Sequence, residues 1–452
     1  MRQYGFSQSM CEWEALDEWR VKIRGILGRE EARKVSPFLL LALSGVGADE
    51  QRHCSELWIR DQVAAARFER PDLDFVFRRP EKKKLRLAYL SADFHEHATA
   101  LLMVELFECH DRERFEVFAY SYGADDGKGM RQRLETAFDR FTDIRALSAI
   151  EAARAIYRDE VDILIDLKGY TQGTRTAILT LRPAPIQVNY LGYPGTLGGD
   201  VCDYIVTDTF ITPPASAPDY SEAFAYMPDS YQPHGRRGII GAKPSRAAAG
   251  LPEQGFVFCC FNQAYKITPE IFDVWCRLLL GTPDSVLWLL KTPMAEDNLR
   301  REAFHRGITA DRIVFAADRS QSDHLGRLQL ADLVLDTAPY NAHTTASDAL
   351  WAGVPIVTCA GDTFPSRVAG SVLNAIGLQE LVATDLDHYF ELALSLATDA
   401  GKLAQITEKL AANRMTTALF GIQGYTRHLE TLYDIMWRKY RNGESPGVIS
   451  AV

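Results

Sequence analysis

Leu85-Arg86-Leu87-Ala88-Tyr89-Leu90 is a short apolar run with the pattern of a buried strand, and the fold can be worked out from it. A helical stretch follows, and Phe115 to Tyr120 then has the pattern of another strand. Strands that alternate with helices predict a mostly parallel, doubly wound sheet. The same series continues with a helix at 149–157 and strands at 161–167, 186–191 and 204–206.

A second alternating series begins after the segment 228–254. That segment is rich in Pro, Gly, Arg and Ser and lacks periodicity, which is typical of an interdomain linker. Two doubly wound lobes in series are therefore expected, with ligands beyond the carboxyl ends of their strands. The second series comprises strands at 257–260, 286–290, 313–315, 333–335 and 355–358, and helices at 269–279 and 345–351.

The two ends of the 452-residue chain are predicted to be helical. Near the N-terminus, 12–27 and 48–67 mix apolar and charged residues at helical spacing. The basic run 81–84 is interpreted as a solvated linker. The expected domains are a helical N-terminal segment at 1–84, an N-terminal lobe at 85–237, a C-terminal lobe at 238–384 and C-terminal helices at 385–452.

Composition excludes several classes of protein. Hydrophobic residues make up 47% of the chain and charged residues 24%, which indicates a globular protein. The net charge of −10 argues against bulk binding to nucleic acid or anionic membrane, because both favour a basic surface. The longest apolar run, around Phe38 to Leu43, is too short to span a membrane, and the N-terminus has no apolar secretory signal.

Cysteine and acidic patterns give no reason to expect a metal or disulfides. The eight cysteines are scattered without a CxxC pair, which is typical of reduced thiols in a cytoplasmic protein. His and Cys show no zinc-ligand spacing. Two Asp-x-Asp triplets, at 72–74 and 385–387, are interpreted as turn or surface carboxylates.

The loop 340–345 is the first candidate for chemistry, because it follows a predicted strand and opens a helix. Thr344 and Thr345 offer hydroxyls and free backbone N–H groups at a positive helix end, which favours an anion. An ordinary N-cap would need only one of these threonines. The presence of His343, and of Asp348 one turn later, favours an anion-binding site over an ordinary cap. Lys266, which follows the first strand of this lobe, is the candidate cation.

In the first lobe, Asp93 and His97 follow the first strand and are candidates to take a proton from an attacking hydroxyl. Neither lobe contains GxGxxG or a Walker loop, so dinucleotide redox and P-loop chemistry lose support.

From about residue 85 to its C-terminus the chain resembles glycosyltransferase family 41, which holds protein O-GlcNAc transferases and SPINDLY-like relatives. The motifs are specific in combination, and they are Ser91-Ala92-Asp93-Phe94 with His97, Gly169-Tyr170-Thr171, Leu181-Arg182-Pro183-Ala184-Pro185-Ile186-Gln187, Leu191-Gly192-Tyr193-Pro194-Gly195-Thr196, Phe261-Asn262-Gln263 with Lys266, and His343-Thr344-Thr345 with Asp348.

The resemblance implies a GT-B fold and an inverting, metal-independent transfer without a cofactor. In this reaction a Ser or Thr hydroxyl of a protein attacks the sugar and displaces UDP, and the favoured donor is UDP-GlcNAc. His97 and Asp93 match the two residues put forward as base or proton relay. The implied donor contacts are Gln263 and Lys266 at the nucleotide and phosphates, His324 and Arg327 near the base, His343, Thr344 and Thr345 at the diphosphate, Asp348 at the ribose, Leu191, Gly192 and Pro194 beside the sugar, and Tyr170 and Thr99 in the same pocket.

Departures from the family pattern leave the donor sugar open. Tyr340 stands where animal O-GlcNAc transferases carry a small Cys beside the N-acyl pocket, and Leu101 replaces a second His. Gln172 and Gln321 replace lysines. The alternatives are a SPINDLY-like O-fucosyltransferase using GDP-fucose, a transferase of another bacterial sugar, a sugar-nucleotide epimerase and an inactive binding module. His343, which SPINDLY-like proteins lack, favours a UDP-sugar.

The chain has no tetratricopeptide array of the kind that the animal enzymes use to select acceptors. Its N-terminal helices, with Trp13 and Trp19, look like the region that joins such an array to the catalytic lobes. Composition does not decide between a naturally short chain and a fragment.

Overall fold

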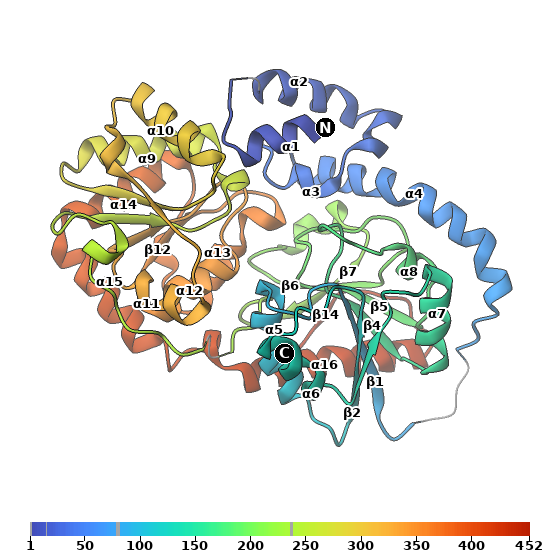
Figure 1. The fold of residues 1–452 in the computed structure, drawn as a ribbon. Coiled ribbons are helices and arrows are strands. Elements are labelled where there is room, and N and C mark those ends of the chain that lie inside the picture. Colours follow the sequence, from blue (N-terminus) through green and yellow to red (C-terminus); the bar gives the residue numbers. More distant parts are fainter. Residues whose placement is uncertain (1, 15, 78–81, 236–237) are drawn as a thin grey trace. The chain divides into compact units, whose positions relative to one another are not determined.

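The computed structural model describes residues 2–14, 16–77, 82–235 and 238–452 (Figure 1). Its contacts divide the chain into two compact units. Unit 1 consists of Met1–Gly25, Leu41–Val46 and Arg236–Phe420, and unit 2 of Ile26–Leu40, Gly47–Gly235 and Gly421–Val452. The boundary at 235/236 falls inside the predicted linker at 228–254.

Unit 2 is built on an eight-stranded sheet in which every pair of neighbours is parallel. The sequence predicted five of these strands; β3 was missed because it is short, polar and half exposed, and β7 and β14 were not recognised. In sheet order the strands are β14 (Ile449–Ser450), β7 (Ala223–Met227), β6 (Tyr204–Asp208), β5 (Ile186–Asn189), β4 (Ile163–Asp166), β1 (Leu85–Ser91), β2 (Phe115–Ser121) and β3 (Arg140–Asp143).

Helices cover this sheet and join its strands. The predicted helix at 149–157 is α7, whose Ser148 and Glu151 form a capping box. The long helix predicted at 48–67 is present as α4 and extends to residue 73. The helices of unit 2 are α3 (Pro37–Leu40), α4 (Ala48–Leu73), α5 (Ala98–Cys109), α6 (Gly129–Ala137), α7 (Ala149–Arg158), α8 (Ala177–Thr180) and α16 (Ile422–Arg441).

Unit 1 contains a six-stranded parallel sheet. All five strands predicted here are present, and β13, only two residues long, was missed. In sheet order they are β10 (Ile313–Ala316), β9 (Val286–Leu290), β8 (Val257–Cys260), β11 (Leu333–Leu335), β12 (Ile356–Cys359) and β13 (Val382–Ala383).

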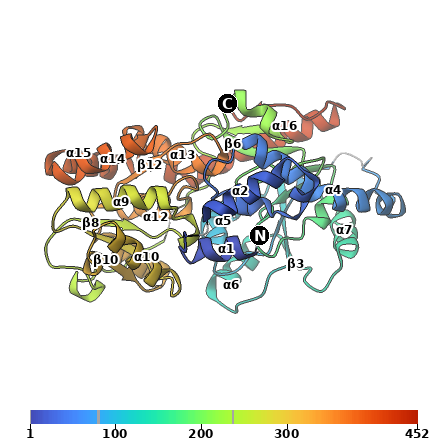
Figure 2. The ribbon, with the colours of Figure 1, turned by 90° about the horizontal axis from the view of Figure 1, so that it is seen from above.

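The helices of unit 1 form two groups on its sheet. In Figure 1, α9 and α14 lie together on one face and α11 and α12 on the other, and Figure 2 shows α14 beside α15. The helices are α1 (Arg2–Ser9), α2 (Leu16–Leu27, which extends into unit 2), α9 (Pro269–Gly281), α10 (Ala295–His305), α11 (Gln321–Leu328), α12 (Thr344–Ala352), α13 (Val368–Ala375), α14 (Leu386–Thr398) and α15 (Ala400–Asn413).

Both sheets have the same strand order. Counted along the chain within each unit, the order is 3-2-1-4-5-6, and unit 2 adds two more strands after the sixth. The connections reverse direction between β1 and β4 in unit 2, and between β8 and β11 in unit 1. At such switch points the loops after neighbouring strands generally lead away from each other, and ligands bind beyond the carboxyl ends of the strands.

The chain ends are divided between the units, which differs from the expected boundaries at 84 and 385. The described residues up to Gly25 are part of unit 1, where Trp13 packs edge-to-face on Phe272 of α9 at 5.3 Å. At the other end, α14 and α15 belong to unit 1, whereas α16 belongs to unit 2. Apolar packing decides to which unit each terminal helix belongs, and the order of the helices along the sequence does not reveal it.

Two local expectations had different outcomes. Lys82 of the basic run is not solvated, because its Nζ lies 3.0 Å from Asp162 Oδ1 and 2.6 Å from the Glu160 carbonyl oxygen. In the triplet 385–387, Asp385 caps α14 by accepting the His388 N–H, which is the expected turn role. In the described part of the chain, no helix combines the length and apolarity needed to cross a membrane.

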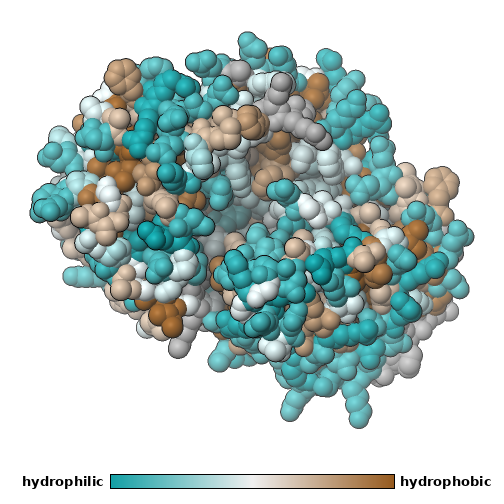
Figure 3. All heavy atoms as spheres, in the orientation of Figure 1, coloured by the Kyte–Doolittle hydropathy of each residue, from teal (hydrophilic) through white to brown (hydrophobic). Residues whose placement is uncertain are grey.

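The surface shown in Figure 3 is mostly hydrophilic, and apolar residues occur on it in small groups.

The cysteines are free thiols, of which seven are buried and Cys109 is half-buried. Burial raises the pKa of Cys54, Cys260 and Cys276 to about 12, so these thiols stay protonated and unreactive at neutral pH.

A buried polar network attaches α16 to unit 2. Glu430 accepts hydrogen bonds from the His110 ring at 2.9 Å and from the Asp111 N–H at 2.8 Å. The other ring nitrogen of His110 lies 2.8 Å from the Tyr89 hydroxyl, which also contacts Tyr433 at 3.3 Å. Burial lowers the pKa of His110, so the neutral ring donates from Nδ1 to Glu430 and accepts from Tyr89.

Replacing Glu430 with Ala is expected to destabilise the protein by about 3 kcal/mol, because it leaves the buried His110 ring and the half-buried Asp111 N–H without this acceptor. Asp434→Ala, on the same helix, removes an exposed ion pair with Arg114 and should cost less than about 1 kcal/mol. Urea unfolding measures both variants. Equal losses would contradict the structural role given to the buried network.

Candidate active site

The loop after β11 in unit 1 is organised by one buried carboxylate. Asp336 Oδ1 accepts from the N–H groups of Thr337 at 2.7 Å and Ala342 at 2.6 Å, and from Asn262 Nδ2 at 3.2 Å. Its Oδ2 accepts from the Thr358 hydroxyl at 2.6 Å. These four bonds tie the carboxyl ends of β8, β11 and β12 together and fix the path of the chain into α12.

Lys266 lies against this loop, in the short 3-10 turn η4 (Ala264–Lys266) that follows β8. Its Nζ donates to the Asn341 carbonyl oxygen at 2.8 Å and sits 3.8 Å from the centre of the Tyr340 ring. Burial lowers the pKa of Lys266 to about 8, while Asp336 opposes that shift. Burial also raises the pKa of Asp336 to about 6. Near neutral pH the site therefore holds one buried cation beside one buried anion.

His343 is the residue that caps α12, but its side chain makes no capping bond. Burial and the Lys266 charge hold the pKa of His343 well below its usual value, so its ring is neutral. The ring hydrogen-bonds the Pro365 backbone, whose carbonyl can only accept, so that nitrogen is the protonated one. Among the described residues, Nε2 is buried without a partner, which leaves it able to accept a bond from a ligand.

The first turn of α12 presents the donors expected of an anion site. The N–H groups of Thr344 and Thr345 have no intrahelical acceptor at this position, and the helix dipole is positive here. The Thr345 hydroxyl donates to Asn262 Oδ1 in a short hydrogen bond. Asn262 therefore connects the Asp336 loop to the start of the helix.

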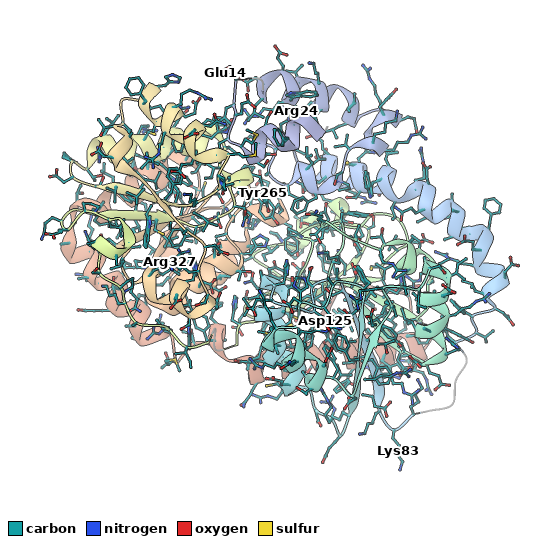
Figure 4. All side chains as sticks on the ribbon, viewed as in Figure 1. Glu14, Arg24, Lys83, Asp125, Tyr265 and Arg327 are labelled. Atoms are coloured by element: carbon teal, nitrogen blue, oxygen red, sulfur yellow. The ribbon has the colours of Figure 1, made fainter. Side chains whose placement is uncertain are left out.

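The α11 helix brings the predicted nucleotide contacts to the same crevice. His324 lies 5.4 Å from the Phe261 ring, and Arg327 stacks on that ring at 4.6 Å while bonding His324 Nδ1 at 2.9 Å. Gln321 Nε2 donates to the carboxylate of Asp348 at 3.0 Å. Figure 4 labels Arg327 on α11 and Tyr265, the neighbour of Lys266. A narrow pocket between β8 and β11 is lined by Phe261, Asn262, His324, Ala342 and Thr345, together with core residues of both strands.

Sequence-predicted residues of this lobe thus meet at one switch point. Lys266, His343, Thr344 and Thr345 lie around the Asp336 loop, and His324, Arg327 and Asp348 on the adjacent helices. Gln263 differs, because it is exposed and contributes its backbone carbonyl oxygen to the turn that ends at Lys266.

The switch point of unit 2 holds a buried ion pair. Lys168, at the carboxyl end of β4, donates to both oxygens of Asp93, at 2.7 and 2.9 Å, and both side chains are more than nine-tenths buried. Asp93 follows β1, and its N–H donates to the Ser91 hydroxyl at 2.9 Å. Because both of its oxygens are engaged by the ammonium, the Asp93 carboxylate is held in a fixed orientation.

His97 caps α5 and lies beside that pair. Its Nδ1 accepts the Thr99 N–H at 3.2 Å and stands 3.7 Å from Asp93 Oδ2. Burial, the strongest influence, lowers the pKa of His97, Asp93 opposes this shift, and Lys168 adds to it. Because Nδ1 accepts a hydrogen bond, the neutral ring carries its proton on Nε2. In this arrangement His97 presents a donor, and it must release Thr99 before it can act as a base.

The turn after β5 packs on the same place. Leu191 has a positive φ of 68°, and a Cβ at Gly192 would lie 1.9 Å from the Leu167 carbonyl oxygen, so only glycine fits there. Pro194 is buried in this turn. Tyr170 is buried as well, bonds the Leu197 carbonyl oxygen and packs on Tyr193, so its side chain supports the turn from within.

The sequence interpretation did not recognise Asp336 and Lys168 as parts of these sites, and it named Asn262 only within a motif and not as a contact. Each follows a short buried strand directly or within two residues, which is the signal that could have revealed them. Among the described residues, no three His, Cys, Asp or Glu side chains gather as a metal-ligand set.

Two parallel sheets with this strand order, each with a switch point, are those of the GT-B fold. Sucrose-phosphate synthase from Thermosynechococcus elongatus shares the fold alone, with a TM-score of 0.53 at 12% identity. The model of the family "Glycosyl transferase family 41" matches residues 59–240 and 238–429. The chain belongs to that family.

Relatives agree with this assignment. The chain is 37% identical over 464 residues to the probable UDP-N-acetylglucosamine–peptide N-acetylglucosaminyltransferase SEC of Arabidopsis thaliana, covering 97% of this chain and 47% of SEC. It is 31% identical over 379 residues to a probable enzyme of the same name, SPINDLY, from Petunia hybrida, covering 81% of this chain and 40% of that protein.

A solved structure, that of a mutant of the Thermobaculum terrenum O-GlcNAc transferase, superposes with a TM-score of 0.80 at 29% identity, covering 92% of this chain and 78% of that one. The chain spans about half the length of the curated relatives it matches.

Proposed function

We propose that this protein transfers GlcNAc from UDP-GlcNAc to Ser or Thr hydroxyls of proteins, with inversion and without a metal ion. The observation that carries the proposal is the buried ammonium of Lys266 beside the open first turn of α12, at the switch point of unit 1. A cation beside a helix N-terminus suits an anionic phosphate group, such as the diphosphate of a sugar nucleotide. The names of the relatives support the sugar and the protein acceptor.

In unit 1 the proposed task is to stabilise the departing UDP. Negative charge grows on the diphosphate as the bond to the anomeric carbon breaks. Lys266 and the N–H groups of Thr344 and Thr345 are fixed before the reaction, so they need no reorganisation when that charge appears. His324 and Arg327, which bond each other, are proposed to contact the base, and Asp348, which accepts from Gln321, the ribose hydroxyls.

In unit 2 the proposed task is to orient the acceptor hydroxyl and guide its proton. Asp93 forms an ion pair with Lys168, and His97 presents its Nε2 proton as a donor. His97 becomes a base only if the acceptor complex breaks its bond from Thr99. Asp93 and His97 are therefore proposed to act as an orienting pair, with His97 the member that exchanges a proton. Leu191, Gly192 and Pro194 are proposed to border the sugar.

The second candidate is a transferase that uses another donor, such as GDP-fucose. Tyr340 favours this second candidate, because its ring fills space next to Lys266 and lies 5.2 Å from the His343 ring.

A cytoplasmic location is proposed from the buried free thiols.

Ligand-induced stabilisation separates the candidates. A ligand that binds the folded state at 100 times its Kd stabilises it by about 2.7 kcal/mol, which thermal unfolding detects readily. We expect UDP and UDP-GlcNAc to raise the melting temperature, and GDP and GDP-fucose to leave it unchanged. Stabilisation by GDP alone would reject the proposed donor. Mass spectrometry of an acceptor protein incubated with UDP-GlcNAc then tests transfer, and release of an altered sugar nucleotide without an acceptor would indicate an epimerase.

A further inference from the structure

We propose that Tyr340 is a positioning residue that keeps the Lys266 side chain charged and fixed, by placing the face of its ring against the ammonium. The inference rests on the proposed function only for the use that the enzyme makes of Lys266. The arrangement itself follows from contacts within unit 1. It concerns a side chain that the reaction scheme above does not use.

The first step of the argument is that Lys266 is costly to keep as a cation. It is 7% exposed, and burial lowers its pKa to about 8. An ammonium has three protons to donate, and the Asn341 carbonyl oxygen receives one of them at 2.8 Å. The charge therefore needs further compensation from groups that surround it.

Asp336 supplies only part of that compensation. Its two oxygens already accept four other hydrogen bonds, from Thr337, Ala342, Asn262 and Thr358. Burial raises the pKa of Asp336 to about 6, so it is ionised at neutral pH and acts on Lys266 by charge. Its hydrogen-bonding capacity is committed to holding the loop.

The Tyr340 ring lies where the remaining compensation is needed. Its centre is 3.8 Å from Lys266 Nζ, well inside the distance at which a ring face attracts a cation. Tyr340 is 5% exposed, so water does not screen the contact. Its backbone is held by the bond from the Thr337 hydroxyl to the Tyr340 carbonyl oxygen at 2.7 Å. The same loop thus fixes both the ring and the carbonyl oxygen that Lys266 contacts.

The other titratable groups near Lys266 do not replace the ring. The thiol of Cys260 has a pKa raised to about 12 by burial, so it is neutral. His343 is neutral as well, because its pKa is held well below the usual value. Tyr265 packs on Tyr340 at 6.1 Å, and burial raises its pKa to about 12, so it is neutral as well. Helix α1, which packs on η4, contributes Tyr4, whose pKa burial raises and whose charged neighbours are Arg20 and Glu270.

Direct titration of the lysine tests the inference without reference to catalysis. In full-length protein labelled with ¹³C at lysine Cε, the Lys266 signal is assigned by its loss in Lys266→Met, and its shift is followed against pH. A desolvated cation–ring contact corresponds to a change of about one pKa unit. We expect Tyr340→Leu to lower the Lys266 pKa by about one unit, and Tyr340→Phe to leave it within a few tenths.

Two further variants separate the ring from its surroundings. Tyr265→Phe removes the hydrogen bond between the two tyrosine hydroxyls and keeps the Tyr340 ring, so the Lys266 pKa should not change. Tyr340→Met serves the same purpose as Tyr340→Leu if the latter does not fold. An unchanged Lys266 pKa in the Leu or Met variant overturns the inference, and so does an equal shift in Tyr340→Phe, which would assign the effect to the hydroxyl.

The pH dependence of transfer gives a second readout. If the ammonium is the active form, activity falls as pH rises through the Lys266 pKa. The alkaline limb should move about one unit toward lower pH in Tyr340→Leu and stay in place in Tyr340→Phe. If the wild-type protein transfers no sugar, the proposed function fails while the lysine titration still decides the role of Tyr340. An alkaline limb at the same pH in wild type and Tyr340→Leu would contradict the role proposed for Tyr340.

Discussion

Lys266→Met is expected to lower sugar transfer by about 10²–10³-fold, the cost of removing one preorganised donor from a developing negative charge. Methionine keeps most of the side-chain length and removes the charge. The loss should appear in kcat more than in KM, because the interaction strengthens as UDP departs. The measurement is initial-rate kinetics with UDP-GlcNAc and an acceptor protein.

The same substitution should not weaken the fold. Burial lowers the Lys266 pKa from 10.5 to about 8, so the unfolded chain binds this proton more tightly than the folded protein. The lysine therefore destabilises the folded state by roughly 3 kcal/mol below pH 8, and that cost disappears as pH rises from about 8 to 10.5. Methionine removes the cost but loses the bond to Asn341. We expect unchanged or higher stability at neutral pH.

Lys291→Met is the matched control for this experiment. Lys291 lies in the same unit, after β9, and its side chain is 52% exposed. Its substitution should change neither transfer nor stability by more than a few tenths of a kcal/mol. Retention of full transfer activity in Lys266→Met would refute the role given to the ammonium. A large loss of stability would instead show that the lysine is structural.

Lys168→Met is expected to destabilise the protein by about 3–5 kcal/mol, since it leaves the Asp93 carboxylate buried without its cation. The pair is enclosed, with 7% and 8% of the two side chains exposed. Combining it with Asp93→Leu removes the second charge and should recover most of the lost stability, because a buried pair exchanged for apolar residues is often neutral. Urea unfolding of the single and double variants measures both effects.

Lys128→Met is the control, because Lys128 is exposed at the start of α6 in the same unit. It should unfold like the wild type. A loss below about 1 kcal/mol in Lys168→Met would show that Asp93 is solvated, and would make Asp93 a stronger candidate for the base. A double variant as unstable as the single one would mean that Lys168 supports the loop by packing rather than by charge.

Sequence patterns gave the architecture because they are local. Ten strands were found from short apolar runs, and the two series of alternating strands and helices predicted two doubly wound lobes. The position of Asp93 and His97 after β1, and of Lys266 after β8, followed from the rule that ligands lie beyond strand ends. The resemblance to family 41 rested on motifs, and the family comparison then confirmed the family.

Other features required the folded chain. Asp93 and Lys168 are 75 residues apart, as are Lys266 and Asn341, and no spacing rule connects them. The division of the terminal helices between the units follows from apolar contacts such as Trp13 with Phe272. The basic run was misjudged at Lys82 because its partner, Asp162, lies 80 residues away.

The amino-acid sequence by itself therefore determined the fold, the family and the loops of the candidate site, because periodicity and motif spacing are properties of neighbouring residues. Only the tertiary structure decided the charge states within those loops. It pairs Asp93 with Lys168, places Tyr340 on Lys266 and turns the proton of His97 to Nε2. Burial and charge compensation set these states, and both depend on which distant segments the fold brings into contact.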